Sequence, residues 1–162
     1  MAMPVYPLQS LLSVRLFREE GAKNEVRAAE RRVEEAREAV RKEEEKLEAY
    51  RKWWPEEVDR RYAAILGKKM STDDMGIFRE GLNRLAADEQ IYVQAVNEAV
   101  KAVKMREKEV TAAREAVVIA RKEAAKIEAH RDIWMVDAKK EAERQEDLEM
   151  EEFKSPAGQA DD

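Results

Sequence analysis

Few side chains in this sequence could carry out catalysis or bind a metal. The chain has one histidine, His130, and no cysteine, which excludes thiolate chemistry, cysteine-based zinc sites and disulfide bonds. Carboxylates are abundant but occur in runs such as Glu43, Glu44 and Glu45, whereas catalytic acids need a concave, partly dry site. The five glycines do not form a phosphate-binding Gly-x-x-x-x-Gly-Lys pattern. We therefore expect no enzyme activity, no cofactor and no metal.

The composition narrows the fold and the class of partner. Charged residues make up 41% of the 162 residues and aromatic residues only 6%, which favours a narrow apolar seam over a broad core. The formal net charge is −5, and this argues against nucleic-acid binding, because phosphate binding depends on an excess of Lys and Arg. No signal-peptide pattern opens the chain, and its longest uncharged stretch, residues 1–14, is shorter than the roughly 20 apolar residues of a membrane span. We expect a soluble protein without membrane insertion.

Apolar residues recur at alternating steps of four and three along two long stretches. The first series runs from Ala22 to Trp54, with nine of its ten positions apolar, and the second runs from Phe78 to Leu148, with 16 of 21 apolar. A seven-residue repeat sustained over this distance is typical of helices that pair along one seam. The sequence therefore predicts an all-α fold, a long antiparallel two-helix coiled-coil hairpin, and a monomer in isolation.

The break between the two series places the hairpin turn. Gly67 is a candidate C-cap, and residues 71–74 supply N-cap candidates and first-turn acids. One domain over residues 1–154 is predicted, with a first helix at about 8–66, a turn at about 67–73 and a second helix at about 74–152. Paired residues should have numbers that add up to about 141. Residues 155–162 are predicted to be a disordered tail.

Two local features modify this simple hairpin. Pro55 is expected to bend the first helix or restart it, because proline lacks an N–H group and clashes with the preceding turn. Trp54 lies on the seam, but Trp53 flanks it, and both structural packing and partner binding remain open for that side chain. His130 also flanks the seam, and we expect it to be solvated.

The open end of the hairpin carries more apolar residues than a two-helix seam can bury. Exposed apolar patches often mark interaction sites, although the first residues of the chain could instead fold over these side chains. The protein-binding candidates are Leu11, Val14, Phe17, Ile133, Trp134 and Met135. Beyond them the second helix has no predicted partner, and its acid-rich residues 141–152, with Leu148 and Met150 interspersed, could be a solvated face or could dock on a basic groove.

Two stretches carry a family resemblance. The opening Tyr6-Pro7-Leu8, with Leu11, Leu12 and Arg15 after it, resembles the YscO-like proteins of type III secretion systems and their flagellar relative FliJ. A second stretch is similar to the C-terminal part of YscO-like members: Trp134, Ala138, Lys139, Glu141, Ala142, Arg144, Gln145 and Glu146. The resemblance covers the whole chain in length and architecture.

The resemblance implies a specific role. It implies a cytoplasmic stalk and escort protein of a bacterial injection apparatus, at the periphery of the inner-membrane machinery. The implied partners are the secretion ATPase, the export-gate protein and secretion chaperones. The alternative is a generic coiled-coil spacer or scaffold, whose open end is covered by another copy of the chain.

Overall fold

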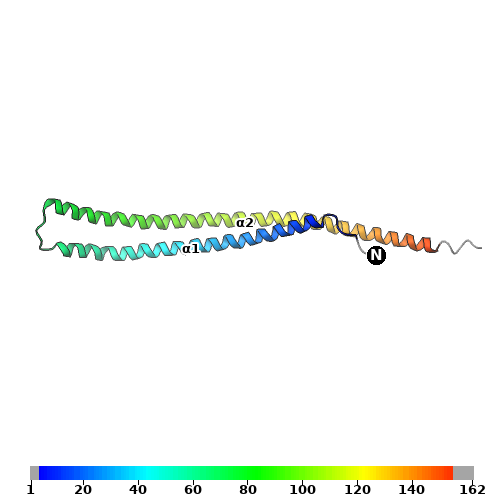
Figure 1. Ribbon diagram of the computed structural model, residues 1–162, viewed down its shortest axis with the longest axis horizontal. Coiled ribbons are helices and arrows are strands. Elements are labelled where there is room, and N and C mark those ends of the chain that lie inside the picture. The colour runs from blue at the N-terminus through cyan, green and yellow to red at the C-terminus, as the bar shows by residue number, and fades with distance from the viewer. Residues whose placement is uncertain (1–3, 155–162) are drawn as a thin grey trace, which may run out of the picture. The chain divides into compact units, whose positions relative to one another are not determined.

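The computed structural model describes residues 4–154, and their secondary structure is two helices. Helix α1 spans Gln9–Ile65 and helix α2 spans Thr72–Lys154, 57 and 83 residues respectively. The two helices run side by side as a helical hairpin (Figure 1), which confirms the predicted fold class. The tail predicted at residues 155–162 lies outside the described residues.

Capping interactions define the hairpin turn. Gly67 has a φ of 77°, a left-handed conformation that glycine adopts without a Cβ penalty. The Lys68 amide donates to the Ile65 carbonyl at 3.1 Å. At the start of α2, the Asp74 amide donates to Ser71 Oγ at 3.1 Å, and the Ser71 amide donates to the Asp74 carboxylate at 3.3 Å. This reciprocal pair is a capping box, so the chain stops one helix and starts the next within a few residues.

The chain divides into two units. Unit 1 contains Met1–Val26 and Ala113–Asp162, and unit 2 is the continuous stretch Arg27–Ala112, which includes the turn. Both helices take part in both units. Each unit is therefore a paired segment of α1 and α2.

In unit 2 the seam is built from the predicted apolar series. Its buried apolar side chains are Ala29, Val33, Tyr50, Leu85 and Val110. Ion pairs between the helices flank this seam, at 2.9 Å from Arg51 Nε to Glu89 Oε1 and 3.6 Å from Arg37 to Glu107. Ion pairs of this exposed kind contribute little free energy, so the stability of unit 2 comes mainly from the buried layers.

In unit 1 the seam extends to the first turn of α1. Leu12 is fully buried, and Ala113 and Ala124 of α2 are buried as well. Arg15 Nη1 donates to the Glu123 carbonyl at 2.9 Å, and Arg121 Nε lies 3.4 Å from a Glu19 carboxylate oxygen. Within unit 1 the seam positions of α2 are at least half-buried from Ala113 to Ala138, whereas Glu141, Gln145 and Leu148 are exposed.

Pro55 does not restart α1. The helix runs without a break from Gln9 to Ile65 with Pro55 inside it. An interior proline costs about 3 kcal/mol, and aromatic side chains in the preceding turn, Tyr50 and Trp53, pack against each other with ring centroids 5.6 Å apart. The packing of these residues on the seam offsets the free-energy cost of the hydrogen bond that the proline cannot make.

Candidate protein-binding surfaces

Tyr6, which precedes α1, packs onto α2. Tyr6 is only 5% exposed, and its hydroxyl forms a hydrogen bond with Nδ1 of His130 at 2.5 Å. Its ring meets Trp134 edge-on, with centroids 5.4 Å apart. His130 is exposed, as expected for a flank position, but it also anchors the start of the chain. Tyr6 thus covers part of the apolar surface that the sequence left open.

The six candidate residues lie on both helices of unit 1, and five of them are exposed. Phe17 and Ile133 are the most exposed, at 80% and 65%, whereas Trp134 is half-buried beneath Tyr6. Phe17 follows the buried Leu12 by five residues, which turns it about 140° away around the helix. Ile133 lies one residue, or about 100°, from Trp134. On α1, Leu11, Val14 and Phe17 are spaced three residues apart and share one face, whereas on α2 Ile133 and Met135 lie on either side of Trp134.

The last turns of α2 form a second exposed region of unit 1. Leu148, Met150 and Phe153 are exposed, Phe153 at 91%. A shallow groove there is lined by Glu146, Glu149, Met150 and Phe153. Acidic and apolar side chains are mixed on this stretch of helix, which no part of α1 covers.

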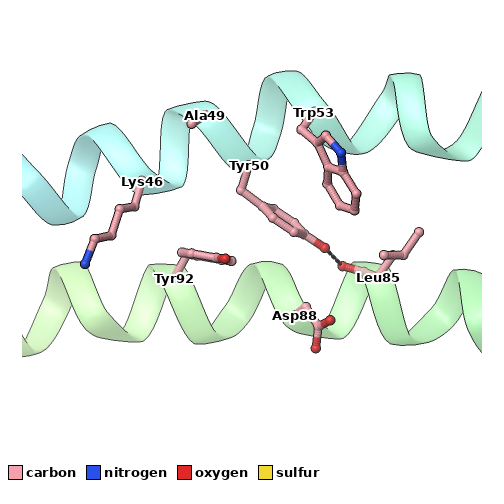
Figure 2. A pocket seen from close by; sticks show the side chains of 7 residues that line it. All are labelled: Lys46, Ala49, Tyr50, Trp53, Leu85, Asp88 and Tyr92. Atoms are coloured by element: carbon pink, nitrogen blue, oxygen red, sulfur yellow. Dashed lines mark hydrogen bonds between the residues drawn. The ribbon is translucent and has the colours of Figure 1, made fainter.

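A third region lies in unit 2, where an open groove of about 610 Å³ runs between the helices (Figure 2). We call it the aromatic groove, and its lining residues are Lys46, Ala49, Tyr50, Trp53, Leu85, Asp88 and Tyr92. The sequence indicated Trp53 but missed its neighbours from α2. The pairing rule could have found them, since Trp53 with Asp88 and Tyr50 with Tyr92 both match the predicted register.

Tyr50 is the structural centre of the aromatic groove. Its hydroxyl crosses the seam and donates to the Leu85 carbonyl, as Figure 2 shows, and its ring stacks on Tyr92 with centroids 4.8 Å apart. Burial raises the pKa of the Tyr50 hydroxyl, and the Asp88 carboxylate adds to this effect. The Tyr50 side chain is therefore fixed in place and neutral.

Trp53 takes part in structural packing and also remains partly accessible. Its ring packs on Tyr50, yet 40% of the residue remains exposed at the edge of the groove. Trp54, on the seam, has a buried indole N–H with no hydrogen-bond partner among the described residues. Trp53 thus offers an aromatic face to solvent from a rigidly packed position.

Among residues 4–154, no three His, Cys, Asp or Glu side chains come together as a metal would require. Neither helix, over the residues described, contains a stretch long and apolar enough to span a bilayer.

Comparisons with known proteins identify the family. No curated protein gave a match. A solved structure of a candidate YscO homolog, CT670 from Chlamydia trachomatis, is similar at 25% identity with a TM-score of 0.74, covering 97% of this chain and 96% of that one. The family model described as type III secretion protein YscO matches residues 8–156. This chain therefore belongs to the YscO family of type III secretion proteins.

Proposed function

We propose that this protein is a cytoplasmic stalk and escort of the type III secretion apparatus, and that it binds the export ATPase, the export gate and the chaperones of secreted substrates. Membership of the YscO family makes it a type III secretion component. The finer role is supported by the surface of unit 1, where large apolar side chains remain exposed on both helices.

The exposed side chains of unit 1 carry the proposal. Phe17 and Ile133 point away from the seam that holds the helices together, so they contribute little to folding. Large apolar groups of this kind commonly provide the energy of protein–protein contacts. Their distribution around both helices suits a protein that contacts several partners on different sides.

Binding to the purified export ATPase of the same secretion system tests the proposal. Ile133→Ala should weaken that complex by about 2 kcal/mol, or roughly thirty-fold in affinity, if Ile133 is a central contact. Ile91→Ala is the matched control, because Ile91 is equally exposed, at 66% against 65%, but lies in unit 2. The export-gate protein and a secretion chaperone are assayed in the same way.

The generic spacer or scaffold is the competing function. It predicts that neither Phe17→Ala nor Ile133→Ala affects binding to any of the three partners. It also predicts that analytical ultracentrifugation of the purified chain shows self-association that these substitutions abolish. That pair of results would refute the stalk and escort role.

A further inference from the structure

All but one of the half-buried acidic side chains of unit 2 form an ion pair. Where such a side chain is half-buried, it forms an ion pair with Arg or Lys: Glu43 with Lys46, Glu57 with Arg60 and Arg61, Glu89 with Arg51, and Glu109 with Arg106. Asp88 is also half-buried, but it has no hydrogen-bond or ion-pair partner among the residues described. A partly desolvated carboxylate without a cation costs free energy.

The surroundings of Asp88 explain why no cation among residues 4–154 neutralises it. Asp88 and Glu89 are adjacent on α2, so their side chains are turned about 100° from each other around the helix axis. They therefore lie on opposite flanks of the seam. On the Glu89 flank α1 provides Arg51 at 2.9 Å. On the Asp88 flank α1 provides Trp53, an indole, in the same groove. Arg84, one turn earlier on α2, is exposed and forms no ion pair with Asp88.

The Lys46 and Tyr50 side chains of the aromatic groove are already paired within the chain. The Lys46 ammonium, at the far end, lies 3.3 Å from a Glu43 carboxylate oxygen. The Tyr50 hydroxyl donates its hydrogen bond to the Leu85 carbonyl. The groove therefore combines one unneutralised carboxylate with the exposed face of Trp53 and the stacked Tyr50 and Tyr92 rings.

We propose that the aromatic groove binds an arginine side chain of a partner protein, with its guanidinium stacked on Trp53 and paired with Asp88. Aromatic faces attract cations, and the planar guanidinium stacks on them better than an ammonium does. The carboxylate supplies the opposite charge, and the aliphatic stem of arginine covers the apolar floor of the groove. The site is separate from the candidates of unit 1, and it stands whether or not the proposed function holds.

A peptide titration of the intact protein tests the site. The probe is the capped peptide Ala-Leu-Arg-Leu-Ala, and the comparison peptide carries citrulline, which has the same shape without the charge. Binding is followed by NMR at low salt through the three indole N–H signals, with Trp53→Phe identifying that of Trp53. The arginine peptide should shift the Trp53 signal and leave those of Trp54 and Trp134 in place.

Matched variants separate the site from general charge attraction. Asp88→Asn should weaken arginine-peptide binding by about fivefold, whereas Glu89→Gln, the same charge change one residue away, should change it less than about twofold. Trp53→Leu keeps an apolar side chain but removes the ring, and it should weaken binding to a similar extent as Asp88→Asn. Circular dichroism confirms that each variant retains its helix content.

Three results would overturn the proposal. They are the absence of a Trp53 shift at millimolar peptide, equal binding of the citrulline peptide, and equal losses in Asp88→Asn and Glu89→Gln. The last result would mean that the peptide responds only to the overall acidity of the protein.

Discussion

Tyr6 and His130 are separated by 124 residues in the chain, yet the Tyr6 hydroxyl oxygen lies 2.5 Å from Nδ1 of His130. With the edge-on contact between Tyr6 and Trp134, this bond fastens the segment before α1 to the middle of α2. This contact lies near the start of α1, whereas α1 leaves unit 1 at Val26. The Tyr-Pro-Leu opening therefore has a structural role in this member of the YscO family.

Removing the Tyr6 hydroxyl should loosen this attachment without unfolding the hairpin. Tyr6→Phe deletes one hydrogen bond, which is worth about 1 kcal/mol, and Tyr6→Ala also uncovers Trp134. We expect amide hydrogen exchange of residues 9–16 to accelerate slightly in Tyr6→Phe and strongly in Tyr6→Ala. Residues 45–55 of unit 2 serve as the internal control, and their exchange should not change. Uniform acceleration along the chain would contradict a local role.

The seam prediction can be tested with two valines of unit 2. Val110 is 8% exposed and Val100 is 37% exposed, so the same substitution meets a dry seam at one position and solvent at the other. Val110→Asp should destabilise the hairpin by about 3 kcal/mol or more, because it buries an unpaired charge. Val100→Asp should cost much less. Thermal unfolding followed by circular dichroism measures both, and similar midpoints for the two variants would show that the assigned seam is wrong.

Much of the fold could be predicted because the seam repeat is unbroken. Side-chain contacts between the helices match the predicted register at both ends, from Tyr62 with Phe78 near the turn to Glu19 with Arg121 in unit 1. Arg106 is the exception among the inner positions of the series, since it is exposed and its guanidinium pairs with Glu109. A long arginine can leave a seam position and reach solvent, so periodicity alone does not prove burial.

The binding surfaces were harder to predict, for physical reasons that differ by region. Tyr6 lies outside any helix, so no periodicity indicated its burial. In the sequence, Asp88 does not differ from the other acidic residues that flank the seam. Its distinguishing feature is that Trp53 lies across from it in the same groove. Such properties depend on which side chains meet across the seam. A pattern within one helix does not contain that information.

The Tyr50 hydroxyl should make stability depend on pH at the alkaline end. Burial raises its pKa above the ordinary tyrosine value of about 10, so near pH 10 the unfolded state loses this proton while the folded state keeps it. The contribution is therefore complete below pH 10 and is lost as the pH rises through the folded-state pKa. Tyr50→Phe should remove this part of the alkaline slope, and it should cost about 1 kcal/mol at neutral pH.

Chemical denaturation at a series of pH values compares Tyr50→Phe with the unsubstituted protein. Tyr62→Phe is the control, because Tyr62 also contacts an aromatic ring across the turn but is 49% exposed. The difference in unfolding free energy between Tyr50→Phe and the unsubstituted protein should shrink above pH 10. A constant difference would mean that the Tyr50 hydroxyl titrates normally in the folded protein.

The terminal turns of α2 should be dispensable for the stability of the rest of the chain. Residues 139–154 have exposed apolar side chains and no seam contact with α1, and an isolated helix of this length is marginal in water. A chain ending at Ala138 should therefore unfold within about 2 °C of the 162-residue chain, since little buried area is lost. In the 162-residue chain, amides of residues 143–154 should exchange much faster than those of residues 113–127.

A partner that docks on the terminal turns would slow their exchange, and the shortened chain would not bind that partner although its folding is unchanged. A large fall in the unfolding temperature of the shortened chain would show instead that these turns support the hairpin itself.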